Sequence, residues 1–75
     1  MKLSEARIGK TYRLMSCDTA YKTRNKLETL GLVPGELITI IQSTSAGIIA
    51  EIKHSRLAIS YDLAGCLAIY DLLDE

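Results

Sequence analysis

Residues 26–37 read KLETLGLVPGEL, and this short stretch holds the chain's only proline and two of its five glycines. The leucines before the first glycine have helical spacing, so we expect a helix that ends at Leu30. Gly31 then stands where chains commonly turn left-handed, which glycine does without a Cβ penalty. The Leu32 amide would then donate to the Leu27 carbonyl, and the two leucine side chains would meet. The stretch therefore predicts a helix end fixed by a Schellman motif.

A chain reversal is expected directly after this helix end. Pro34 fixes φ at about −65° and Gly35 accepts positive φ, the preferred pair at the centre of a type II turn. The turn leads into ELITIIQS, residues 36–43, whose isoleucines leave neither face polar. We expect this segment to be a central strand that is covered on both sides.

Upstream of this joint the pattern predicts a strand and a short amphipathic helix. Residues 11–17, TYRLMSC, alternate so that Tyr12, Leu14 and Ser16 share one face of a strand. Residues 20–30, AYKTRNKLETL, have an apolar stripe along one helix face, and Asp18 or Thr19 could supply the N-cap oxygen. A single helical turn around Ser4 and Glu5 precedes both elements.

Downstream, three further strands are expected. Residues 48–53 place Ile48, Ala50 and Ile52 on one face, and His54 and Ser55 form a tight connection to a strand over residues 56–61. Asp62 could cap one helical turn before the last strand, residues 66–72.

These elements fit one small β domain. The chain has 75 residues, enough for a single domain over residues 1–75 and for no second core. A chain of this length cannot cover both faces of an open sheet. We therefore expect the sheet to close on itself, so that one face becomes the interior of a barrel. We predict a mainly β fold: a small SH3-like barrel of about five strands, with one short helix inserted after the first strand.

Composition excludes several classes. No apolar run approaches the roughly 18 to 20 residues needed to cross a bilayer, and the start MKLSEARIGK lacks a signal-peptide core, so a cytoplasmic protein is expected. The two cysteines, Cys17 and Cys66, form no CxxC or Cys/His cluster and suit reduced buried thiols better than a disulfide or a metal site.

Charge is unevenly spread although the net charge is zero. Residues 1–26 carry seven basic and two acidic side chains, and residues 27–75 carry two basic and seven acidic ones. Such asymmetry can orient a domain on an acidic partner, unless the fold interleaves the two segments and cancels the field.

No motif in the sequence predicts catalysis. There is no P-loop, no GxGxxG and no GxSxG, and the single histidine, His54, is expected to be a solvated turn residue. Cys17 and Asp18 are better explained by a strand end and a helix cap. Asp71, Asp74 and Glu75 lie at an acidic terminus without fixed geometry, which makes a poor cation site. We therefore predict no catalytic residues, no bound metal and no cofactor.

The succession RNKLETLGLVPGELITII, IIAEIKHSRLAIS and AGCLAIY resembles the FeoA family of small cytoplasmic accessory domains of bacterial ferrous iron transport. The resemblance runs from about Ile8 to Tyr70. Its most specific part is LxxLGLxPG, from Leu27 to Gly35. The sequence departs from the family where His54 and Ser55 replace a usual glycine turn and where Ser60 replaces a common basic residue. The resemblance implies an SH3-like barrel that interacts with the membrane transporter FeoB, near its cytoplasmic GTPase portion.

The leading functional hypothesis is a non-enzymatic interaction module that docks on FeoB. A positive helix face can attract an acidic partner, and an apolar loop beside it can bury against that partner. The alternative is that these residues have no partner: Leu32 would then be a buried core residue, and the lysines would only keep the surface soluble. The predicted partner-binding residues are Lys22, Arg24, Asn25, Lys26, Gly31, Leu32 and Val33.

Two other functions remain as alternatives. Similar barrels occur at the C-termini of iron-dependent repressors, so this chain could be a regulatory module that acts in trans. Nucleic-acid binding would need a basic groove with exposed aromatics, whereas the four tyrosines do not cluster and the net charge is zero. We expect no nucleic-acid partner and no membrane insertion. Oligomeric state, transient contact with a transition metal, and activation versus inhibition of the transporter are left open.

Overall fold

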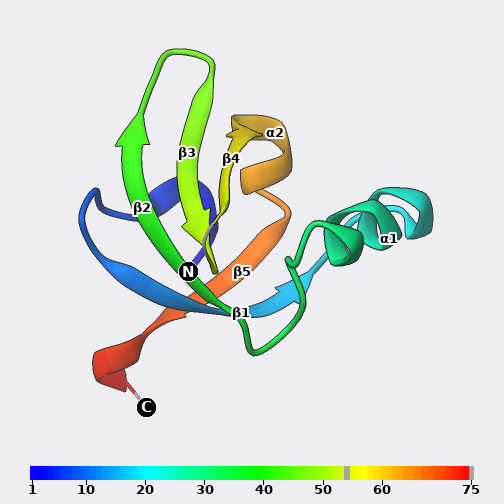
Figure 1. Ribbon diagram of the computed structural model, residues 1–75, viewed down its shortest axis with the longest axis horizontal. Coiled ribbons are helices and arrows are strands. Elements are labelled where there is room, and N and C mark those ends of the chain that lie inside the picture. Colours follow the sequence, from blue (N-terminus) through cyan, green and yellow to red (C-terminus); the bar gives the residue numbers. More distant parts are fainter. Residues whose placement is uncertain (54, 75) are drawn as a thin grey trace.

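An antiparallel sheet of five strands, in the order β4-β3-β2-β1-β5, forms the body of the protein in the computed structural model (Figure 1). The structure describes residues 1–53 and 55–74, so the predicted roles of His54 and Glu75 lie outside the described residues. The strands are β1 (Thr11–Cys17), β2 (Leu37–Ser43), β3 (Gly47–Ile52), β4 (Ser55–Ser60) and β5 (Leu67–Asp71). The helical elements are η1 (Leu3–Glu5), α1 (Tyr21–Thr29), α2 (Tyr61–Ala64) and η2 (Leu72–Asp74).

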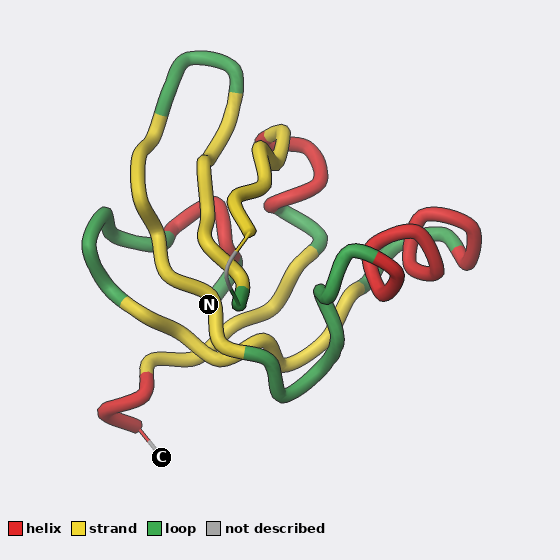
Figure 2. Tube along the Cα trace, viewed as in Figure 1, coloured by secondary structure: helices red, strands yellow, loops and turns green. Residues whose placement is uncertain are grey.

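The predicted set of strands is confirmed, with the main helix between β1 and β2 (Figure 2). The sheet curls around one apolar interior, to which all five strands contribute. No helix in the described ranges has both the length and the apolarity to cross a membrane. The buried side chains that form the core are Leu3, Tyr12, Leu14, Cys17, Leu27, Leu32, Ile38, Ile40, Ile48, Ala50, Ile52, Ile59, Ala64, Leu67 and Ile69.

The joint between α1 and β2 forms as predicted. Gly31 has φ +99°, its N–H donates to the Glu28 carbonyl at 3.0 Å, and the Leu32 N–H donates to the Leu27 carbonyl at 2.8 Å. These two hydrogen bonds define a Schellman motif. Gly35 has φ +94°, and the Glu36 N–H donates to the Val33 carbonyl at 3.0 Å, which closes the following turn. Glycine is required at both positions because a Cβ would strain a positive φ.

Both predicted helix N-caps are wrong. The N-cap of α1 is Ala20, which offers no side-chain hydrogen bond, and the Asp18 N–H is instead used in a bond to the Cys66 carbonyl. Ser60, not Asp62, caps α2, because the Ser60 hydroxyl accepts from the Leu63 N–H at 3.3 Å. Local cap preference is therefore satisfied at α2, by a serine two residues before the predicted cap, and is not satisfied at α1.

A β-bulge changes which side chains of β1 face the core. The pairing of β1 with β5 shifts register between Leu14 and Ser16, so Met15 interrupts the alternation. Cys17 is buried and Ser16 is exposed, the reverse of the predicted faces. Burial raises the pKa of the Cys17 thiol. Both cysteines are free thiols, and Cys66 is only half-buried.

The central strand is covered on one side only. β2 is the middle strand, as predicted, and Ile38 and Ile40 are fully buried. The expectation that its other face would also be covered is wrong, since Leu37 remains 41% exposed and Ile41 is half-buried. A chain this short builds one layer of core inside the curled sheet and has no further element to cover the outer face.

A hydrogen-bonded ion pair connects the basic and acidic parts of the sequence. The Lys10 ammonium donates to the Asp71 carboxylate, and it also lies 5.6 Å from the centroid of the Tyr12 ring. This bond, helped by the Leu73 N–H, lowers the pKa of Asp71 below the ordinary value of 3.8, and the same bond raises the pKa of Lys10 above 10.5.

We expect this pair to make stability pH-dependent at both ends of the scale. As pH falls, the unfolded chain binds the Asp71 proton first, so the carboxylate's contribution is present above about pH 4 and is lost as pH falls through the lower folded-state pKa. The Lys10 contribution is lost as pH rises through its raised pKa. Denaturant unfolding at a series of acid pH values should show a steeper loss of stability for the wild type than for Asp71→Asn. If the stability of the two proteins fell equally with pH, the ion pair would make no contribution to stability.

Candidate functional site

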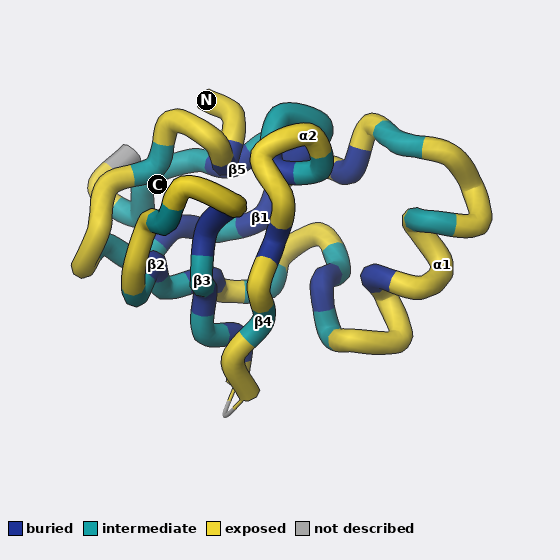
Figure 3. The backbone as a smooth tube through the Cα atoms, turned by 90° about the horizontal axis from the view of Figure 1, so that it is seen from above, coloured by how far each residue is buried: buried dark blue, intermediate teal, exposed yellow. Residues whose placement is uncertain are grey.

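A hollow in the described surface lies between helix α1 and strand β4. It has a volume of about 480 Å³, and we call it the α1–β4 groove. Helix α1 stands away from the end of the sheet and is exposed along most of its length, with Leu27 its one buried residue (Figure 3). The residues that line the α1–β4 groove are Lys22, Thr23, Lys26, Leu27, Leu30, Leu32, Leu57, Ala58, Ile59 and Leu63.

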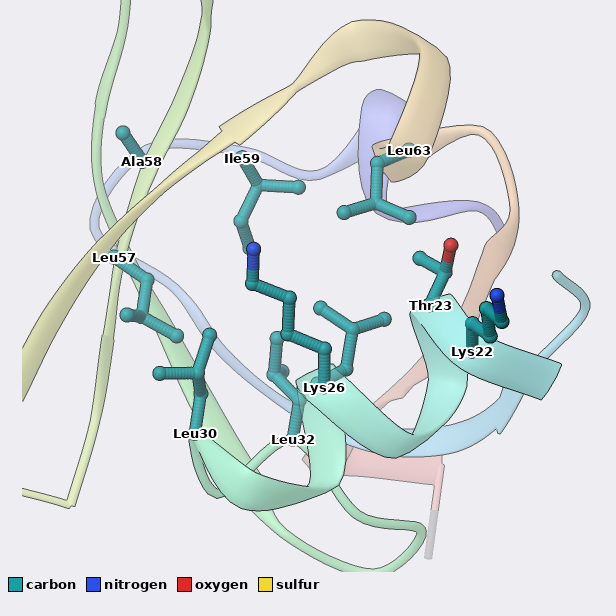
Figure 4. A pocket seen from close by; sticks show the side chains of 10 residues that line it. Lys22, Thr23, Lys26, Leu30, Leu32, Leu57, Ala58, Ile59 and Leu63 are labelled. Atoms are coloured by element: carbon teal, nitrogen blue, oxygen red, sulfur yellow. The ribbon is translucent and has the colours of Figure 1, made fainter. Parts of the chain in front are cut away.

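The groove is apolar on most of its walls and positive along one rim. Leu30 is 47% exposed, and Leu57 and Leu63 are half-buried against the core. The Lys26 side chain points from α1 into the groove, toward β4 (Figure 4). Among the described residues neither Lys22 nor Lys26 has an ion-pair partner, and no acidic side chain lines the groove. The positive charge of this rim is therefore not neutralised by an ion pair with a described residue.

Only some of the predicted partner-binding residues lie at the α1–β4 groove. Lys22, Lys26 and Leu32 line the groove, but Leu32 has no exposed surface and acts as a buried wall of the core. Arg24 and Asn25 are exposed on α1 outside the lining, with the Arg24 guanidinium 5.8 Å from the centroid of the Tyr21 ring.

Gly31 and Val33 belong to the joint after α1 and do not line the groove. A Cβ on Gly31 would lie 3.6 Å from Ile52 Cγ2, so this glycine packs against the end of β3. Both residues are half-buried. Their role as partner contacts stays a prediction.

Sequence reasoning missed the second wall of the groove. Leu57, Ala58, Ile59 and Leu63 come from β4 and α2, more than 25 positions beyond the helix in the sequence. The alternation in residues 56–61 predicts a strand but does not say which element packs beside it. Leu30, an apolar residue at the helix C-cap, was the one local indication that this end of α1 faces something apolar.

The potential metal ligands of the described chain are not gathered into a cluster. Within residues 1–53 and 55–74 no cluster of three or more His, Cys, Asp or Glu side chains could hold a metal ion. The absence of a cofactor and of a resident metal therefore stays an expectation drawn from the sequence.

The sequence matches the family model described as FeoA domain over residues 1–70. No curated protein sequence matches the chain. A crystal structure of an iron uptake regulatory protein, FeoA, is 32% identical; the alignment covers 96% of this chain and 97% of that one, with a TM-score of 0.87.

Two more distant structures share the fold. FeoA of Stenotrophomonas maltophilia, complexed with zinc and described as a prokaryotic SH3-domain protein with a suggested activating role in ferrous iron transport, is 19% identical over 92% of this chain and 88% of that one, with a TM-score of 0.79. IdeR of T. acidophilum is 18% identical over 95% of this chain and 33% of that one, with a TM-score of 0.84. The predicted SH3-like fold is confirmed by these likenesses.

Proposed function

Because this chain belongs to the FeoA domain family, we propose that it is a non-enzymatic accessory domain of bacterial ferrous iron uptake that docks on the cytoplasmic part of the FeoB transporter. The proposal requires a cytoplasmic location, which agrees with the composition of the chain. The family membership supports a role in ferrous iron transport, and the sequence offers no catalytic motif.

The α1–β4 groove is the observation that carries this proposal. Exposed apolar surface at Leu30, with half-buried Leu57 and Leu63 beside it, can anchor a partner by burial. Lys22 and Lys26, which form no ion pair with a described residue, can steer and orient an acidic surface. An exposed apolar hollow with a charged rim supports the view that a partner occupies it.

A titration with the transporter's purified cytoplasmic domain tests the docking. We expect binding in the micromolar range, and we expect Lys26→Glu to weaken it about tenfold because a like charge replaces an attractive one at the groove rim. Arg7→Glu is the matched control, since it makes the same charge change at an exposed residue that neither lines the groove nor belongs to the predicted partner-binding set. It should change the affinity less than about twofold.

Two results would contradict the proposal. One is an absence of binding at high micromolar concentrations of the transporter domain. The other is binding that responds equally to Lys26→Glu and Arg7→Glu, which would mean that the groove is not the contact surface.

The runner-up function is a regulatory module that acts in trans. The fold likeness to the repressor IdeR is what favours it, and that likeness covers only 33% of the repressor chain. A module of this kind would bind a DNA-binding protein and leave the transporter domain unbound. The same titration therefore separates the two functions.

A further inference from the structure

The α1–β4 groove runs along the edge of strand β4. Three consecutive residues, Leu57, Ala58 and Ile59, line it. Successive side chains of a strand point to opposite faces of the sheet, and Figure 4 shows Leu57 and Ile59 directed toward the groove and Ala58 directed away from it. Ala58 therefore borders the groove with its main chain, which places the backbone of β4 within reach of an occupant.

One edge strand of the sheet is hydrogen-bonded to a further segment of the described chain, and the other edge strand is not. The edge at β5 is covered, because the Ile69 N–H donates to the Met1 carbonyl at 2.8 Å and the Met1 ammonium donates to the Ile69 carbonyl at 3.0 Å. Lys2 also pairs with Ala68 in this covering segment. β4, in contrast, pairs only with β3 within the described chain. Its outer N–H and C=O groups are a template for another strand.

The wall that faces this edge is one side of a helix. Lys22, Thr23, Lys26 and Leu30 follow helical spacing along α1, and Figure 4 shows them across the groove from β4. A slot between an open strand edge and a helix is suited to an extended peptide, since main-chain hydrogen bonds supply affinity and flanking side chains supply specificity.

We propose that the groove binds an extended segment of the partner as an additional strand on β4. The segment carries acidic side chains toward Lys22 and Lys26, and apolar side chains toward Leu30, Leu57 and Leu63. β4 has six residues, so the added strand spans at most about 20 Å. This rests on the proposed docking function and specifies how the partner is recognised: by strand addition and by charge.

Hydrogen exchange on the complex tests the strand addition. With the transporter's cytoplasmic domain bound, we expect amide protons of β4 to exchange at least about tenfold more slowly, because they gain hydrogen bonds, while those of β5 are unchanged. Binding without protection of β4 would overturn the inference and leave the docking function standing. No binding of the domain would overturn the docking function, and the edge site would then be judged by peptides alone.

Synthetic peptides supply that independent test. The probe is a short peptide that alternates glutamate with valine or leucine; the matched controls replace glutamate with lysine, or methylate alternate backbone nitrogens. We expect only the unmodified acidic peptide to bind and to protect β4, and we expect Lys22→Glu with Lys26→Glu to abolish its binding. Equal binding of the lysine peptide or of the N-methylated peptide would overturn the proposal, as would protection of β4 by self-association of the free chain at the same concentration.

Discussion

Replacing Gly47 with alanine is expected to destabilise the domain by about 3 kcal/mol, at the upper end of the usual cost of overpacking. A Cβ at this position would lie 2.3 Å from the Ile59 carbonyl oxygen and 3.1 Å from Ser60 Cα. These atoms belong to the backbone of β4, which is paired with Gly47 and cannot rotate away like a side chain. A domain of this size has about 3 to 5 kcal/mol in total, so most of its stability would be lost.

Gly65→Ala is the matched control for this prediction. Gly65 has φ −68°, and an added Cβ would meet its nearest neighbour, the Tyr61 carbonyl oxygen, at an ordinary 3.5 Å. This change should leave stability within about 1 kcal/mol of the wild type, since alanine also restricts the unfolded chain. Denaturant unfolding measures both variants. Equal stabilities would mean that β3 and β4 do not approach as closely as described.

Leu32→Ala is expected to cost about 2 to 5 kcal/mol, because it opens a cavity in the core. Leu32 is fully buried, and its N–H bond to the Leu27 carbonyl closes the joint between α1 and β2. Leu30, two residues earlier, is 47% exposed in the same groove. Leu30→Ala should therefore leave stability nearly unchanged and weaken binding of the transporter domain.

The pair of leucine variants separates a core role from a docking role. Unfolding curves report the first, and titration with the transporter domain reports the second. A Leu32→Ala protein that is as stable as the wild type but fails to bind would show that Leu32 contacts the partner directly, contrary to its burial.

The set of strands and the local motifs were the parts of the fold that could be predicted. The Schellman bond from Leu32 to Leu27 and the turn at Gly35 depend on residues within a few positions of one another, and both form as expected. The face reversal at Cys17 depends on how β1 pairs with β5. That pairing joins residues about 50 positions apart, and alternation within one strand cannot reveal a bulge imposed by another.

The candidate site also has one part that the sequence predicts and one part that only the assembled fold shows. The sequence identified the lysine face of α1, because helical spacing places Lys22 and Lys26 together. It did not identify Leu57 and Leu63, because packing of α1 beside β4 is a property of the assembled fold. The charge asymmetry is partly cancelled where Lys10 meets Asp71, and it persists at the groove, where both lysines lack acidic partners among the described residues.

The most direct test of the account is an NMR map of the isotope-labelled domain titrated with the transporter's cytoplasmic part. We expect chemical-shift changes concentrated at the walls of the α1–β4 groove, at Lys26, Leu30, Leu57 and Leu63. Met15 and Leu37, exposed apolar residues of β1 and β2 outside the groove, serve as the internal control. Changes confined to Met15 and Leu37, with the groove residues unmoved, would contradict it.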